Sequence, residues 1–188
     1  MKINAPDIRE VELAFINLMQ SLNLDLTDSN LKDTPKRLAK MYINELFCGL
    51  YEDEPLVKEF ESEGRGFLYT KVPFKSTCAH HFQPIHGDAH IFVDYSNSKY
   101  VLGLSKFNRI VDYYARRPTL QEQLTNDILT SLITKLGTED VMVILEASHA
   151  CVTDRGVCAA YSNTITQLTK STSKEFINNC NMHFTRGV

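Results

Sequence analysis

An amphipathic helix is the strongest structural signal in this chain. Between Pro118 and Gly137, apolar side chains recur every fourth residue; they are Leu120, Leu124, Ile128, Leu132 and Leu136. This spacing puts them on one face of a helix, and that face has to be buried against another element. Thr119 is expected to cap the start of the helix, and Gly137 is expected to end it.

Segments of strand character lie on both sides of this helix in the sequence. Phe67–Phe74 and Ala89–Tyr95 precede it, whereas Val141–Ser148 and Val157–Leu168 follow it. A second helix is expected over Ser105–Arg116, because Pro118 ends its pattern. The resulting order, β-β-α-α-β-β, predicts an α+β fold.

The N-terminal third of the chain has a different character. Residues 8–22 show a helical pattern, and a second helix is expected to begin with Thr34 as its cap and to stop near Gly49. Residues 52–66 are acidic and contain glycine, which is typical of a linker or surface loop. We therefore expect an N-terminal helical extension with a linker over residues 1–66 and the main folded domain over residues 67–188.

Composition narrows the class of protein. Hydrophobic residues make up 43% of the 188 residues, which is enough for a core, and the net charge is −3. Without a basic excess, binding to nucleic acid or to an anionic membrane is not expected, although a few cations could still converge on a small anion. The absence of a long apolar run near the N-terminus and the odd number of cysteines, five, predict a cytoplasmic protein with reduced thiols.

Two short motifs carry ligands that zinc prefers. Cys78 and His81 form a Cys-x-x-His pair, which alone is weak, since a buried cysteine and a surface histidine would look the same. His149 and Cys151 follow the third strand, and two residues that are two positions apart on an extended segment face one side. Taken together, Cys78, His81 and Cys151 give two thiolates and an imidazole, and leave a fourth zinc position open for water, as in catalytic sites. His80 and His149 would then be free for proton transfer.

A possible anion site opens the helix over Ser105–Arg116. Helix N-termini attract phosphate, and Lys106 and Arg109 share a face because they lie three residues apart. Arg155, four residues after Cys151, could add another cation. The alternative is that Ser105 is only a helix cap and that the two basic residues form a solvated face.

Gln121 and Glu122 begin the next helix and also have two readings. Glu122 stands three residues after Thr119, as in a capping box. Its carboxylate could instead accept the two N–H donors on the Watson–Crick edge of a guanine.

Several separate motifs in one order resemble the GTP cyclohydrolase I family, over about Leu22 to Phe176. These motifs are Asp33-Thr34-Pro35-Lys36-Arg37, Cys78-Ala79-His80-His81-Phe82, Gly103-Leu104-Ser105-Lys106-Phe107-Asn108-Arg109, Arg117-Pro118 with Gln121-Glu122-Gln123-Leu124-Thr125, and His149-Ala150-Cys151 with Arg155-Gly156-Val157.

This resemblance implies a tunnelling fold whose four antiparallel strands join those of neighbouring subunits into a five-membered barrel, with two pentamers stacked into a homodecamer. It implies that Cys78, His81 and Cys151 hold Zn²⁺, and that a zinc-activated water attacks C8 of GTP. His149 and His80 would handle protons, formate would leave, and the ring would reclose as 7,8-dihydroneopterin triphosphate.

The resemblance also assigns the substrate contacts. Ser105 would assist the rearrangement of the ribose. The triphosphate contacts would be Lys106, Arg109, Arg155 and, across a subunit boundary, Arg37; the guanine contacts would be Gln121 and Glu122. Two alternatives share the fold: a non-catalytic purine- or pterin-binding module, and the nitrile reductase of queuosine biosynthesis, which uses a nucleophilic cysteine with NADPH. Release of formate from GTP distinguishes all three.

Overall fold

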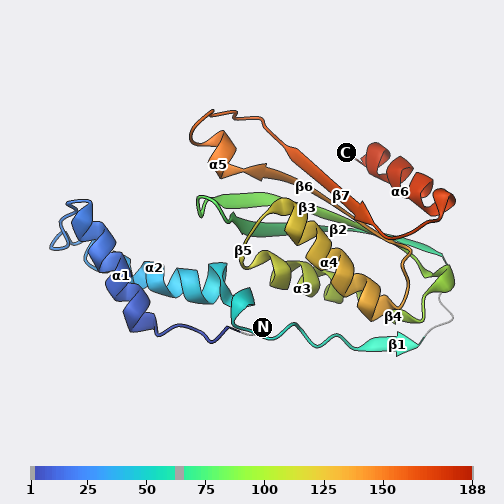
Figure 1. The fold of residues 1–188 in the computed structure, drawn as a ribbon, viewed down its shortest axis with the longest axis horizontal. Coiled ribbons are helices and arrows are strands. Elements are labelled where there is room, and N and C mark those ends of the chain that lie inside the picture. Colours follow the sequence, from blue (N-terminus) through green and yellow to red (C-terminus); the bar gives the residue numbers. More distant parts are fainter. Residues whose placement is uncertain (1–2, 62–65, 188) are drawn as a thin grey trace. The chain divides into compact units, whose positions relative to one another are not determined.

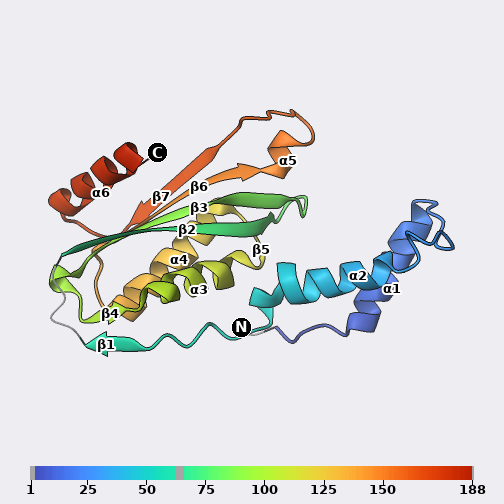
Figure 2. The same cartoon turned by 180° about the vertical axis from the view of Figure 1, so that it is seen from behind.

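The computed structural model describes residues 3–61 and 66–187 of the chain (Figures 1 and 2). They divide into two compact units, and the division falls between Asp53 and Glu54. Residues 54–61 thus belong to the second unit, whereas the sequence analysis grouped them with the N-terminal part. Among these described residues, no helix combines the length and the apolar character that crossing a bilayer requires.

The N-terminal unit is built from two helices, α1 (Ile8–Ser21) and α2 (Thr34–Met41), as the sequence predicted. The Asp7 side chain caps α1 by accepting a hydrogen bond from the Arg9 N–H. Helix α2 starts one residue earlier than expected, since Asp33 is its N-cap and Thr34 is its first residue. Its path continues through a π-helical turn over Tyr42–Leu46 and a 3₁₀ turn over Cys48–Leu50.

The second unit is organised around one five-stranded sheet in the order β5-β2-β3-β6-β7. The strands are β2 (Phe67–Cys78), β3 (Pro84–Asp94), β5 (Pro118–Thr119), β6 (Val141–His149) and β7 (Thr164–Thr169). All neighbours are antiparallel except β5, which runs parallel to the end of β2. The last strand is shorter than predicted: it begins at Thr164, and the chain from Val157 to Asn163 is not strand.

Two helices, α3 (Leu104–Ala115) and α4 (Gln121–Leu136), cover one face of this sheet (Figure 1). The predicted stripe of α4 supplies much of the buried core there, against alternate residues of β2, β3 and β6. Its first residue, Leu120, is the exception, because it is the N-cap of the helix and is 43% exposed. Gly137 ends α4 in the left-handed conformation, at φ 66°, as its position predicted. This face is the main hydrophobic core of the protein.

The opposite face of the sheet is covered by a helix that the sequence analysis did not predict, α6 (Lys174–Gly187) (Figure 2). Phe176 and Cys180 of α6 pack against Phe92, Met142 and Ile144, which alternate along the strands with the residues of the main core. The sheet is therefore apolar on both faces where α6 covers it, whereas Lys71 and Lys75, farther along β2 on that second face, are exposed.

A small two-stranded sheet lies apart from this one. Strand β1 (Glu59–Glu61) pairs antiparallel with β4 (Tyr100–Leu102), so part of the expected 52–66 linker is a strand. Positions 62–65 of that linker lie outside the described residues.

Candidate metal centre and active site

The turn between β2 and β3 positions two of the predicted metal ligands. Cys78 ends β2, and its N–H donates to the Gln83 carbonyl while its own carbonyl accepts from the Phe82 N–H. Phe82 takes a left-handed backbone conformation, at φ 52°, which closes the turn. Cys78 is buried at 5% exposure, and His81 stands exposed within the turn.

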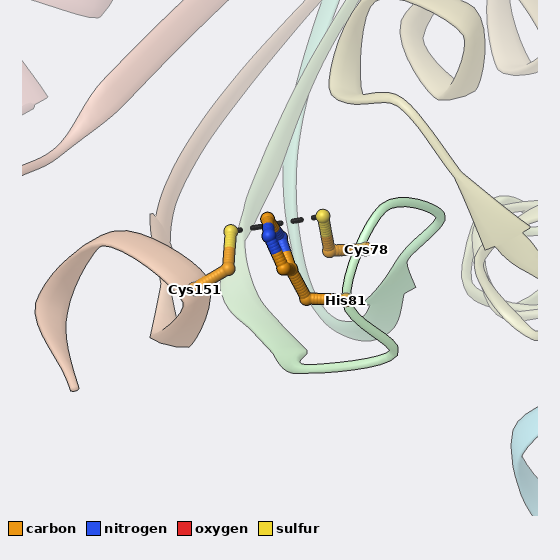
Figure 3. A group of neighbouring side chains, drawn as sticks. All are labelled: Cys78, His81 and Cys151. Carbon is orange, nitrogen blue, oxygen red and sulfur yellow. Dashed lines mark hydrogen bonds between the residues drawn. The ribbon is translucent and has the colours of Figure 1, made fainter. Parts of the chain in front are cut away.

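Helix α5 (Ala150–Thr153) supplies the third ligand, Cys151. His149 and Cys151 were predicted to lie on one extended segment, and this is wrong, because β6 ends at His149 and the chain then turns into a helix. Cys151 nevertheless reaches the β2–β3 turn, where its Sγ lies 3.6 Å from the Sγ of Cys78 (Figure 3).

Cys78, His81 and Cys151 form one cluster whose ligand atoms all lie within 4.8 Å of one another. In a tetrahedral zinc site, two sulfurs each about 2.3 Å from the ion are about 3.8 Å apart. The observed Sγ–Sγ separation of 3.6 Å is close to that value. Two thiols and one imidazole are also a donor set that zinc accepts, so the residues fit this metal in both chemistry and spacing.

The surroundings of Cys151 favour its protonated thiol when no metal is bound. Burial, together with the adjacent Cys78 sulfur, raises the pKa of the Cys151 thiol, while Arg155 acts in the opposite direction. A divalent ion between the sulfurs would relieve this penalty, since it binds thiolates. Arg155 Nη1 also donates to His81 Nε2 at 2.8 Å, so that nitrogen carries a lone pair and no proton.

All five cysteines are free thiols, as predicted. Cys48 and Cys180 are buried and Cys158 is exposed, none of them in the metal-compatible cluster. Burial raises the pKa of the Cys180 thiol to about 12, which keeps it protonated under α6.

A second polar group consists of His149, which lies two residues before Cys151, and Gln121, to which it is hydrogen-bonded. His149 Nε2 lies 2.6 Å from Gln121 Oε1, and Gln121 begins α4 directly after β5, which pairs with Cys78. Burial lowers the pKa of His149 below its ordinary value, although the negative charge of Glu122 raises it. The neutral imidazole is therefore favoured, as a proton acceptor requires.

Gln121 and Glu122 differ sharply in exposure. Gln121 is 3% exposed, and its side-chain amide contacts Leu145, Thr164 and Thr166 of the sheet. Glu122 is exposed at the first turn of α4. The expected capping box is absent, because Leu120 is the N-cap of α4 and no side chain caps it.

Thr119 cannot cap α4 because it belongs to β5. Its carbonyl accepts the Ala79 N–H, and its hydroxyl donates to the Leu120 carbonyl. Glu122 therefore does not serve in a capping box, and its guanine contact is the remaining prediction for this residue. The contact expected of Gln121 stays a prediction.

The N-terminus of α3 presents the predicted anion-binding residues. Gly103, and not Ser105, is the N-cap, so the alternative that Ser105 serves only as a cap is wrong. Ser105 and Arg109 are exposed and Lys106 is half-buried. Within residues 3–61 and 66–187, neither basic side chain forms an ion pair, which leaves both charges available to a ligand.

The two remaining predicted residues lie at other positions. His80 is exposed in the β2–β3 turn beside His81, with 6.3 Å between the ring centroids. Arg37 belongs to the N-terminal unit, where it is exposed and lies 3.7 Å from Asp33.

Two polar residues of the site went unnoticed in the sequence. Thr125 and Thr166 are joined by their hydroxyls at 2.7 Å, and both belong to the hydrogen-bond network of Gln121. Thr125 lies one helical turn after Gln121, and this spacing is the signal that could have revealed it. Thr166 is 45 residues from Gln121, and no local pattern connects the two.

Comparison with known proteins identifies the family of this chain. The sequence model of the family described as GTP cyclohydrolase I matches residues 11–185. A protein named GTP cyclohydrolase 1 from Flavobacterium johnsoniae is 43% identical over 163 residues, which is 85% of this chain and 72% of that protein. Proteins of the same name from Aeromonas salmonicida (47% identity, 79% of this chain and 69% of that protein) and Wigglesworthia glossinidia brevipalpis (41%, 87% and 76%) are also similar. The chain belongs to the GTP cyclohydrolase I family.

Proposed function

We propose that this chain converts GTP and one water to 7,8-dihydroneopterin triphosphate and formate. The observation that carries the proposal is the cluster of Cys78, His81 and Cys151, with ligand atoms within 4.8 Å, two residues along the chain from a half-buried His149. Family membership supplies the substrate and the reaction, and the cluster supplies a site where such chemistry can occur.

Cys78, His81 and Cys151 would hold a zinc ion in this site. Zinc with three protein ligands acts as a Lewis acid and makes hydroxide available near neutral pH. The chain places the ligands on two different elements, the β2–β3 turn and α5, which are brought together by the pairing of β3 with β6.

Proton transfer would fall to the two histidines that are not ligands. His149 is the better placed as an acceptor, because its burial favours the neutral ring. His80 is exposed in the turn and can exchange protons with solvent. Ser105, exposed in the first turn of α3, would assist the rearrangement of the ribose.

Substrate binding would use the exposed charges around the site. Lys106, Arg109 and Arg155 would contact the triphosphate, with Arg37 of a neighbouring subunit also contributing, because charge-assisted contacts to phosphate are the strongest that the chain offers. The exposed carboxylate of Glu122 would accept the N–H donors of the guanine. Gln121 is the remaining predicted guanine contact.

We also propose the tunnelling fold and its assembly, in which sheets of neighbouring subunits join into a barrel of five and two such rings form a decamer. The five-stranded sheet supports this, because β7 is its outer strand within the described residues, and a closed barrel removes such edges. Light scattering at micromolar protein should give the mass of an oligomer. A stable monomer would contradict the assembly.

The test of the activity is to incubate the purified protein with GTP and to measure formate and pterin fluorescence. Both should appear in equal amounts, and the Cys151→Ser variant should produce neither. Binding of GTP without formate would instead indicate a receptor and would contradict the proposal.

A further inference from the structure

The orientation of the Gln121 side chain is fixed by its partners. The amide nitrogen Nε2 lies 3.1 Å from the Leu145 carbonyl and 3.0 Å from the Thr164 carbonyl. Carbonyl oxygens only accept hydrogen bonds, so the NH₂ group has to face them. The amide oxygen Oε1 therefore faces His149, and the reversed orientation would place oxygen against two carbonyls.

This orientation determines the tautomer of His149. Gln121 Oε1 can only accept, and His149 Nε2 lies 2.6 Å from it, so Nε2 carries the proton. In the neutral ring the lone pair then belongs to Nδ1. The nitrogen that can accept a proton is thus selected by a side chain other than the histidine itself.

Two threonines hold Gln121 from the other side. The Thr125 hydroxyl donates to the Gln121 backbone carbonyl at 2.7 Å, so its oxygen is left to accept from Thr166, also at 2.7 Å. The Thr166 oxygen lies 3.1 Å from Gln121 Nε2 and can share that donor. Each hydroxyl in this group therefore has one assigned direction, and the network connects α4 to β6 and β7.

We propose that Gln121 is a positioning residue that holds His149 in the Nε2–H tautomer. The network explains its burial, because both N–H donors of the amide are used on the chain's own carbonyls and the oxygen is used on His149. A guanine contact would require one of these groups to be released. This inference deepens the proposed function and rests on it for the role of His149 in proton transfer.

The direct test is ¹⁵N NMR of the protein labelled at histidine, recorded well above the ordinary imidazole pKa of about 6.5. The His149 signals are identified by their absence from the His149→Ala spectrum. The wild type should show a protonated Nε2 and an unprotonated Nδ1, and Gln121→Leu should show a mixture of tautomers. A wild-type ring protonated at Nδ1 would overturn the proposal, whatever the variant does.

Kinetics separate positioning from guanine recognition. Gln121→Leu should lower kcat by about 10- to 100-fold, as the loss of an orienting partner typically does, with the KM for GTP within about 2-fold of the wild type. Glu122→Gln, at the proposed guanine contact, should instead raise KM. A Gln121→Leu variant with raised KM and unchanged kcat would overturn the positioning role.

The two proposals can fail independently. If the wild type releases no formate from GTP, the proposed function fails, while the tautomer of His149 is still measured by NMR. Circular dichroism and zinc content of Gln121→Leu check that the fold and the cluster are intact. If that variant does not fold, the wild-type spectrum alone decides.

Discussion

Two polar regions of the candidate site differ in burial and in how many hydrogen bonds the chain itself makes to their side chains. Gln121 and His149 are held by hydrogen bonds from β6, β7 and α4, with Gln121 almost wholly buried. Ser105, Lys106 and Arg109 begin α3 with exposed or half-buried side chains, and the two basic ones have no ion-pair partner among the described residues.

This difference matches two kinds of work. A group that transfers a proton has to be in place before the substrate arrives, so the chain itself satisfies and orients it. A group that binds phosphate has to keep its donors free for the ligand, so the chain leaves it unpaired. Substitutions in the first region should therefore affect turnover, and substitutions in the second should affect binding.

The largest loss of activity is expected when a metal ligand is replaced, because proton transfer and substrate binding both serve the reaction at the metal. Cys151→Ser and His81→Ala should lose zinc and all measurable formate release, because each removes one of three ligands. Metal analysis of the purified variants is the measurement, and Cys158→Ser, an exposed cysteine outside the cluster, is the matched control. Full zinc occupancy in both ligand variants would show that the cluster is not the metal site.

Replacing His149 should reduce turnover while leaving the metal in place. His149→Ala is expected to lower kcat by about 10²–10⁴-fold, the usual contribution of a positioned acid or base, and to bind GTP as the wild type does. Stopped turnover with retained zinc would support the separation of roles. Loss of zinc from this variant would make His149 a ligand and would require His81 to be reassigned.

The exposed region should respond in binding. Lys106→Ala or Arg109→Ala is expected to raise the KM for GTP about 10-fold and to weaken its dependence on salt, since each removes one charge-assisted contact to phosphate. Lys170→Ala, an exposed lysine outside the predicted site, is the control. An unchanged KM in both variants would mean that these residues form only a solvated face.

The smallest expected effect concerns stability and comes from His90, a buried histidine outside the site. His90 is 1% exposed, and burial, with help from Lys71, lowers its pKa despite Glu146 and Asp88. Its ring also contacts the Tyr69 hydroxyl at 2.9 Å and Phe184 of α6.

The sign of the pH effect follows from this lowered pKa. The unfolded chain binds a proton at His90 near its ordinary pKa of 6.5, whereas the folded chain does so only at lower pH. The free energy of unfolding should therefore fall as the pH drops below 6.5, by at most about 1.4 kcal/mol per pH unit. Urea unfolding of the wild type and of His90→Gln measures it, and an equal slope in both would refute the contribution of His90.

Much of the fold could be predicted from local pattern. The stripe of α4 from Leu124 onward and its end at Gly137 were correct, because a period of four and a left-handed glycine are local signals. The cap expected at Thr119 was wrong, since Thr119 pairs with Cys78 and accepts the Ala79 N–H, a contact that no local pattern reveals. Helix α6 was missed although Phe176, Ile177, Cys180 and Phe184, which form its side of the second core, recur at helical spacing.

The metal ligands of the site could be predicted from the sequence, but the residues that position its catalytic groups could not. Cys78, His81 and Cys151 were found from residue type, spacing and resemblance, although the local reason for Cys151 was wrong. The burial of Gln121 could not be foreseen, because its partners Leu145 and Thr164 lie 24 and 43 residues away. Sequence pattern thus identified the residue types that perform chemistry more readily than the residues that position them.

A zinc titration tests the central claim most directly. Protein stripped of metal by a chelator is supplied with increasing zinc, and formate release from GTP is measured at each step. The account predicts no release without zinc, a linear rise, and a plateau at one zinc per chain, with no recovery in Cys151→Ser. Full formate release from the metal-free protein would contradict it.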